Sequence, residues 1–167
     1  MPDEIKRIII QYCSPVLLGC KPAALFMLHS ERAFALLSGM LRPRFKLMIL
    51  RKNERGLLVL VFEKDQLEET LLNREILAVL AGRGYPAGAS LFVLLDYLIK
   101  RFACKDFPHE IGLFLGYPVE DVLGFVKHKG LNYKFCGYWK VYGDVDNAKK
   151  CFQQYDKCRE CVKAVFP

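Results

Sequence analysis

The 167-residue sequence lacks a hydrophobic run that could cross a membrane. Its longest apolar region, residues 8–28, is interrupted by Pro15, Lys21 and Pro22, whereas a membrane-spanning helix needs about 20 consecutive apolar residues. We also expect no signal peptide, because the N-terminal segment carries acidic residues and no small-residue cleavage site follows it. We therefore expect a cytoplasmic protein with no membrane partner.

The sequence also lacks any linker-like stretch that would divide it, so we predict a single domain over residues 1–167. The chain is 53% hydrophobic and 26% charged. These values are typical of globular proteins and exclude wholesale disorder.

The formal net charge of +7 is compatible with nucleic acid, with a small anionic ligand, or only with solubility. Basic residues gather between residues 42 and 55, where Glu54 is the only acid. That segment does not interleave arginine with glycine or aromatic residues, as many nucleic-acid-binding segments do. We therefore interpret the basic residues first as a solvated surface.

Seven cysteines without a secretory signal indicate reduced thiols rather than a disulfide framework. Cys158 and Cys161 form a CxxC pair, and Cys151 lies seven residues earlier. At about 100° per residue these three share one stripe of a helix, so we interpret them first as buried core thiols. A zinc site would need a second CxxC or a His pair, which is absent; metal binding by the trio stays open as the alternative.

Hydrophobic spacing predicts most helices and strands of the chain. We expect Asp3 to cap the first helix and Ser14-Pro15 to end it, while the apolar segment ending at Leu28 receives no assignment. The predicted helices cover residues 3–13, 30–41, 66–81, 89–102, 109–115, 118–129 and 144–165, and the predicted strands cover residues 44–49, 57–62 and 133–142.

The strand at residues 57–62 is apolar on both faces, which predicts a central position in the sheet. The fold class is therefore α+β. We expect a small, mainly antiparallel sheet of three strands or slightly more, covered by about six to seven helices.

Residues 107–129 match the spacing of a helix-turn-helix, with Gly112 in the first helix and Val122 anchoring the second. The second helix, however, opens with Glu120 and Asp121, which DNA phosphates would repel. The pattern favours a tight helical hairpin. A nucleic-acid-binding regulator that uses residues 109–129 and the basic segment stays an alternative.

His109 and Glu110 open the same hairpin, where a helix dipole favours a carboxylate and a neutral imidazole. The plain interpretation is an acidic first turn beside a half-buried histidine. The sharper one makes neutral His109 a general base, a metal ligand or the partner of a thiol. Cys13, at the end of the first helix, is the candidate nucleophile. No HExxH occurs, because position 113 is Leu, which excludes a zincin-type protease.

Three segments carry a family resemblance. They are Cys13-x-Pro15 with Gly19-x-Lys21-Pro22, the run HEIGLFLGYP at residues 109–118, and the run GYWKVY at residues 137–142. In these the chain is similar to an uncharacterised family of bacterial domains of unknown function, found mainly in anaerobic Gram-positive bacteria. The resemblance implies a stand-alone cytoplasmic domain without an established activity. It also implies a loose link to iron or redox physiology, through neighbouring genes for ferrous-iron transport and flavodoxins.

Several polar and aromatic residues are not explained by helix or strand spacing, and we predict that they meet in one pocket. The predicted catalytic residues are Cys13, His109 and Glu110, and the predicted ligand-binding residues are Lys21, Tyr117, Trp139, Lys140 and Tyr142. The two lysines suit a small anionic ligand, whereas His109 and Glu110 suit a metal or a proton transfer.

The leading hypothesis is therefore a protein with a pocket that binds a small molecule or a metal. A more specific version of this hypothesis is a thiol/His-dependent enzyme. A regulator that binds nucleic acid and an adaptor that binds a protein partner are the alternatives. The cofactor, the reaction and the oligomeric state are left open by the sequence.

Overall fold

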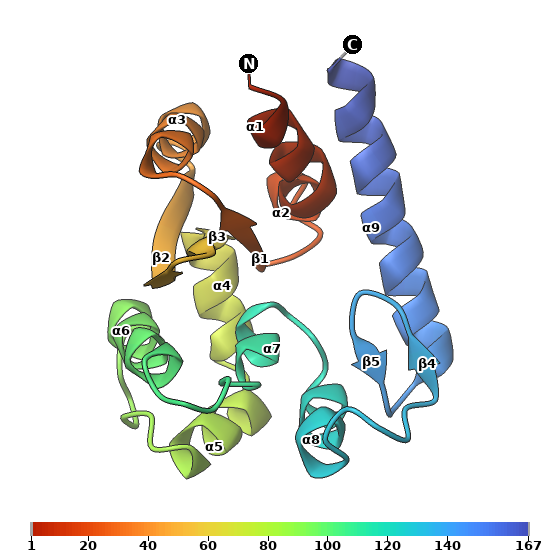
Figure 1. The fold of residues 1–167 in the computed structure, drawn as a ribbon. Helices are drawn as coiled ribbons and strands as arrows, with labels where there is room; N and C mark the ends of the chain where they lie inside the picture. The colour runs from red at the N-terminus through yellow and green to blue at the C-terminus, as the bar shows by residue number, and fades with distance from the viewer. Residues whose placement is uncertain (1, 167) are drawn as a thin grey trace.

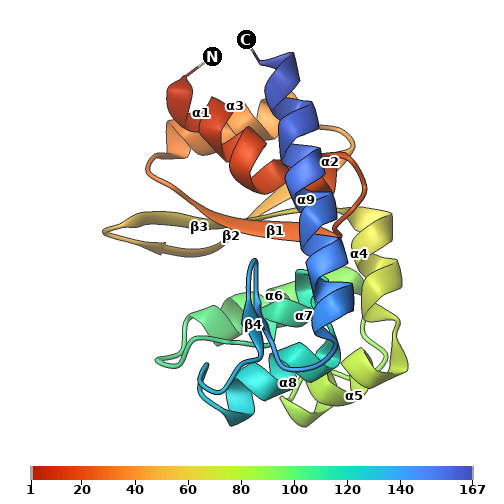
Figure 2. The same ribbon diagram turned by 90° about the vertical axis from the view of Figure 1, so that its right-hand side faces the viewer.

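A three-stranded antiparallel sheet separates two layers of helices in the computed structural model, which describes residues 2–166 (Figures 1 and 2). The strands are β1 (Ala23–Leu28), β2 (Phe45–Asn53) and β3 (Gly56–Glu63), and their order is β1-β3-β2. One face carries α1 (Asp3–Ile8), the π-helical turn η1 (Ile9–Cys13), α2 (Ser14–Leu17) and α3 (Glu31–Leu41).

The other face carries the middle of the chain. Its helices are α4 (Lys64–Leu71), α5 (Arg74–Gly82), α6 (Leu91–Phe102), α7 (Ile111–Phe114) and α8 (Val119–Lys127). A small hairpin of β4 (Phe135–Cys136) and β5 (Lys140–Val141) follows, and α9 (Val145–Val165) ends the chain. The predicted α+β class with an antiparallel three-stranded sheet is confirmed. No helix of residues 2–166 is long and apolar enough to span a membrane.

β3 is the centre of the molecule because it is covered on both faces. Leu57, Val59 and Val61 belong to the core beneath α1, η1 and α3, whereas Leu60 and Phe62 belong to the core with α4–α8. The prediction that residues 57–62 form a central strand is confirmed.

The first helix continues past the point where we expected Ser14-Pro15 to end it. The Ser14 hydroxyl donates to the carbonyl oxygens of Ile9 (3.0 Å) and Ile10 (2.7 Å), and Pro15 lies in the first turn of α2, where its missing N–H costs little. Asp3 is the first residue of α1 and does not cap it.

Two other predicted elements differ from the structure. The helix expected at residues 66–81 breaks before α5, because the Asn73 side chain accepts hydrogen bonds from the N–H groups of Glu75 and Ile76 and caps a new helix. The strand expected at residues 133–142 is a hairpin that turns after Cys136, where the Gly137 N–H donates to the Trp139 carbonyl.

The third strand of the sheet is β1, the apolar segment without an assignment, and it lies at one edge. Helix α9 runs beside this edge and reaches both layers (Figure 2). Its Phe152 and Tyr155 belong to the core of the α4–α8 layer, while Val162 packs against the core of the α1–α3 layer.

Two glycine substitutions test the close approach of β3 to β1, with a glycine of α3 as the comparison. Gly56 begins β3 with φ +128°, and a Cβ there would strike the backbone of Leu28 on β1. We expect Gly56→Ala to lower the free energy of unfolding by about 2–3 kcal/mol. Gly39, inside α3, has open space around it, so Gly39→Ala should raise the same quantity by up to about 1 kcal/mol. Urea unfolding of both variants measures this; equal effects of the two would contradict it.

Candidate functional site

A cavity of about 240 Å³ lies where η1, the α2–β1 loop, the α7–α8 turn, the β4–β5 turn and α9 meet. Aromatic rings and two cationic side chains give the cavity its character. The rings belong to Tyr12, Tyr117, Tyr138 and Trp139, and the cations are Lys21 and Arg159. Asp and Glu are absent from the lining residues. The cavity therefore unites segments from both layers and from α9.

The chain places Lys21 through a tight turn after α2. Gly19 adopts φ +73°, and the N–H groups of Cys20 and Lys21 both donate to the Pro15 carbonyl oxygen, at 2.7 Å and 3.1 Å. Lys21 is thereby held with only 7% of its surface exposed. Its Nζ donates to the Tyr117 hydroxyl at 2.9 Å.

Lys21 has aromatic neighbours instead of a carboxylate. Its Nζ lies 4.5 Å from the ring centre of Tyr117 and 5.6 Å from that of Tyr155. No carboxylate of residues 2–166 forms an ion pair with it. Burial, with the positive charge of Arg159, lowers the pKa of Lys21 to about 7. The amine is therefore both protonated and neutral in comparable amounts near neutral pH.

Tyr117 links the layers and forms one wall of the cavity. Its ring stacks on Trp139 with centres 4.9 Å apart and planes 23° apart, and its hydroxyl donates to the Tyr138 carbonyl at 3.3 Å. Burial raises the pKa of the Tyr117 phenol, so it stays protonated. Gly116, with φ +82°, allows this turn to approach Pro22, whose ring a Cβ at Gly116 would strike.

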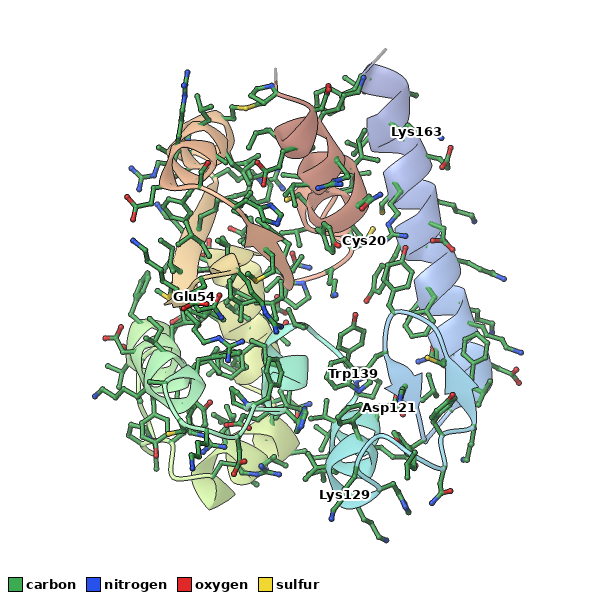
Figure 3. All side chains as sticks on the ribbon, viewed as in Figure 1. Cys20, Glu54, Asp121, Lys129, Trp139 and Lys163 are labelled. Atoms are coloured by element: carbon green, nitrogen blue, oxygen red, sulfur yellow. The ribbon has the colours of Figure 1, made fainter. Side chains whose placement is uncertain are left out.

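Trp139 holds a buried donor that lacks a partner. Its indole Nε1 makes no hydrogen bond within the part of the chain that the structure describes. An unpaired buried donor costs about 1–3 kcal/mol. Figure 3 shows Trp139 at the hairpin, next to α8.

Arg159 approaches the cavity from α9. Its Nε donates to the Gln11 carbonyl at 3.0 Å, and its guanidinium lies 4.5 Å from the ring centre of Tyr138. Gln11 is the residue one turn before Pro15, which has no N–H to donate to that carbonyl. Nη1 of Arg159 lies 3.7 Å from Asp156.

A family model, described as "Protein of unknown function (DUF3793)", matches residues 9–167. The chain belongs to the DUF3793 family. The resemblance to a family of unknown function is thereby confirmed. No curated protein and no solved structure shows significant similarity to the chain. The cavity of this DUF3793 protein must accordingly be interpreted from its own residues.

The structure brings together three of the predicted ligand-binding residues, Lys21, Tyr117 and Trp139. Lys140 and Tyr142 lie outside the cavity lining. Nζ of Lys140 donates to the Gly130 carbonyl (2.7 Å), and the Tyr142 hydroxyl donates to the Leu131 carbonyl (3.0 Å). Both side chains therefore hold the loop after α8.

One ring, that of Phe125, separates His109 from Trp139 of the cavity wall. Its ring centre is 4.8 Å from that of Phe125, which is 5.4 Å from that of Trp139. Burial lowers the pKa of His109, with the charge of Glu110 opposing and that of Arg83 adding to the effect, so the imidazole is neutral at pH 7.

Cys13 does not meet His109. It has no exposed surface and belongs to the core beneath α1 and α3, on the other face of the sheet. Burial raises the pKa of its thiol to about 12, which disfavours the thiolate that nucleophilic catalysis needs.

Glu110 serves an ion-pair network between α5, α6 and α7. Its carboxylate is 1% exposed and accepts from Nε of Arg101 (2.7 Å) and the hydroxyl of Tyr85 (3.3 Å), and it lies 3.8 Å from Nη1 of Arg83. Burial acts to raise its pKa, but the Arg101 hydrogen bond and the two positive charges outweigh burial, so the pKa lies below its ordinary value.

The expectation that three cysteines of α9 lie in the core is wrong for two of them. Cys158 is 2% exposed, whereas Cys151 and Cys161 are exposed. No group of three or more His, Cys, Asp or Glu side chains within residues 2–166 is placed to hold a metal ion.

Asp121, at the start of α8, is buried and accepts from the N–H groups of Tyr142 and Gly143.

Sequence reasoning missed Tyr12, Tyr138 and Arg159 as cavity residues. Tyr12 fits the apolar spacing of the first predicted helix, and Tyr138 lies in the predicted strand at residues 133–142, so spacing alone accounts for both. Arg159 belongs to a helix rich in charged residues, and nothing in its neighbourhood distinguishes it from a solvated side chain. Its hydrogen bond to Gln11 spans 148 residues.

The lowered pKa of Lys21 makes stability depend on pH. In the folded chain the amine loses its proton near pH 7, but in the unfolded chain it does so near the ordinary value of 10.5. The unfolded state therefore binds more protons between these values, and stability rises with pH. Relative to Lys21→Met, the wild type should gain about 2 kcal/mol of unfolding free energy between pH 7 and pH 9. Urea titrations at both pH values measure it, and a constant difference would refute it.

Glu110 makes stability depend on pH in the acidic range, with the same sign as Lys21. Because its folded pKa is below the ordinary 4.5, its ionisation stabilises the fold above that value, and the stabilisation is lost as pH falls through the folded pKa. We expect Glu110→Gln to lose about 2–4 kcal/mol at pH 7, since Arg101 keeps a charge without its partner. The deficit should shrink below pH 4. Unfolding of both proteins from pH 3 to pH 7 tests this, and a deficit independent of pH would argue against the ion pair.

Proposed function

We propose that this DUF3793 protein binds a small planar anion in the cavity between Lys21, Tyr117, Trp139 and Arg159. The observation that carries the proposal is Lys21, a buried amine at the wall of a cavity with no carboxylate partner. Burying an unpaired ammonium is costly. A carboxylate or similar anion in the cavity supplies the missing charge.

The electrostatics of the lining select the sign of the ligand. Lys21 and Arg159 line the space, whereas Asp156, beside Arg159, lies outside the lining, so an anion in the cavity meets a net attraction. Anion binding also favours the protonated amine, and the site takes up a proton as it fills. Affinity should therefore fall when the pH rises above the pKa of Lys21, about 7.

The walls select the shape of the ligand. Tyr117 and Trp139 form a stacked pair, and Tyr12 and Tyr138 add two more rings. Aromatic walls favour flat, unsaturated molecules that stack on them. A volume of about 240 Å³ exceeds the roughly 150 Å³ of a cavity that holds benzene, which suits a single ring with one acidic group.

Rings and aliphatic side chains form most of the cavity wall, and Lys21 and Arg159 are its charged groups. Such a combination of few polar groups and a largely apolar wall is typical of small-molecule sites.

The other hypotheses draw less support from the geometry. A thiol/His enzyme would need Cys13 and His109 together, and the sheet separates them. A nucleic-acid-binding regulator would need a helix-turn-helix at residues 109–129, but α7 is a single turn, and Asp121 accepts hydrogen bonds from the N–H groups of Tyr142 and Gly143, between β5 and α9. The small-molecule form of the leading hypothesis is therefore the one we retain.

The chain contains a single tryptophan, Trp139, so its fluorescence reports on the proposed site alone. We expect benzoate to change this emission in a saturable way, and neutral benzamide to bind at least tenfold more weakly. Lys21→Met should raise the dissociation constant of benzoate by about 10- to 100-fold, the value of one or two charge-assisted hydrogen bonds.

Lys149→Met is the matched control, because Lys149 is an exposed lysine of α9 whose amine lies over Phe135, outside the cavity lining. It should leave benzoate binding unchanged. Circular dichroism verifies that each variant is folded. Absence of saturable binding by benzoate and its hydroxylated analogues, or equal binding of benzoate and benzamide, would overturn the proposal.

A further inference from the structure

Cys20 and Cys158 lie next to each other although 138 residues separate them in the sequence. Their Sγ atoms are 3.2 Å apart. Cys20 belongs to the turn between α2 and β1, and Cys158 belongs to α9; Figure 3 shows Cys20 between α2 and α9. An S–S bond measures about 2.05 Å, so a shift of about 1 Å in a short turn joins the two sulfurs.

Their surroundings assign different roles to the two thiols. Cys158 is 2% exposed and donates its S–H to the sulfur of Cys20, which also receives a hydrogen bond from Nε2 of Gln154 at 3.7 Å. Burial and the hydrogen bond to Cys20 raise the pKa of Cys158 to about 12. Cys20 is partly exposed. Reagents therefore reach Cys20 rather than Cys158, and the Cys20 S–H itself donates to the Leu18 carbonyl at 3.7 Å.

We propose that Cys20 and Cys158 form a reversible disulfide, with a low-molecular-weight disulfide such as oxidised glutathione as the oxidant. The Cys20 thiolate attacks one sulfur of the oxidant and releases the first thiolate, leaving a mixed disulfide on Cys20. Burial keeps most of the Cys158 thiol protonated, but in the folded chain its sulfur lies 3.2 Å from that of Cys20, so the small ionised fraction is held at its target. Cys158 then gives its proton to solvent, attacks the Cys20 sulfur and releases the second thiolate. Two protein thiols are oxidised, and one disulfide is reduced to two thiols.

The CxxC pair of α9 does not provide the same chemistry. Cys161 is exposed, one turn along the helix from Cys158, whereas Cys158 directs its S–H to Cys20. No other two cysteines of residues 2–166 are hydrogen-bonded to each other. The proposed disulfide therefore joins the α2–β1 turn to α9 rather than neighbouring residues of one helix.

The disulfide lies one residue from the proposed binding site. Because Lys21 follows Cys20 directly, the bond fixes the turn that holds the Lys21 amine against Tyr117. It also closes a loop of most of the chain, which restricts the unfolded state strongly. The proposal does not depend on anion binding, since it rests only on the two sulfurs and their neighbours.

The test treats the reduced, folded protein with oxidised glutathione at pH 8. We expect five of the seven thiols to stay open to alkylation after denaturation. Peptide mapping should find a Cys20–Cys158 link, and dithiothreitol should restore all seven. The oxidised protein should also melt at a higher temperature than the reduced one.

Variants distinguish the pair from general thiol oxidation. Cys20→Ser and Cys158→Ser should abolish the link, whereas Cys161→Ser, the matched control, should retain it. If Cys158→Ser does not fold, Cys20→Ser and the wild-type peptide map carry the test. A link between Cys158 and Cys161, an oxidation that persists in Cys20→Ser, or a glutathione adduct that never resolves would each overturn the proposal.

Discussion

The rest of the structure depends on the burial of β3 on both faces. An eight-residue apolar strand that is shielded on each side needs two separate sets of helices. The chain meets this need by folding its first part over one face and its middle part over the other. Edge strand β1 then becomes the boundary where both layers and α9 meet, and the cavity lies at that boundary. The place of the site thus follows from the two-sided core.

At that boundary the protein buries an amine where an apolar side chain would pack without electrostatic cost. The Lys21–Tyr117 hydrogen bond connects residues 96 positions apart, and it ties the α2–β1 turn to the α7–α8 turn. Glu110 shows how the same fold treats a buried charge that serves structure, since two arginines and a tyrosine surround it. Lys21 has no such neutralising partner. The contrast between the two is the reason to regard Lys21 as a ligand-binding group.

Helix α9 supplies a residue to each of the two proposed sites. It supplies Arg159 to the cavity and Cys158 to the thiol pair, one residue apart on the same turn. Helix α9 also contacts η1 and α2, which precede the sheet in the sequence. A change in the turn at Cys20 therefore acts on the same segment that positions Lys21, through one peptide unit.

The sequence by itself determined the α+β class, the central strand and the last helix, because these depend on the local spacing of apolar residues. It also singled out Lys21, Tyr117 and Trp139, since helix and strand spacing do not explain them. It did not separate them from His109, Lys140 and Tyr142, nor did it identify β1, Arg159 or the Cys20–Cys158 pair. Those were decided by tertiary structure alone. Strand β1 is defined by its pairing with β3, and the contacts that place Arg159 and join Cys20 to Cys158 span 148 and 138 residues, which leaves no periodic trace in the chain.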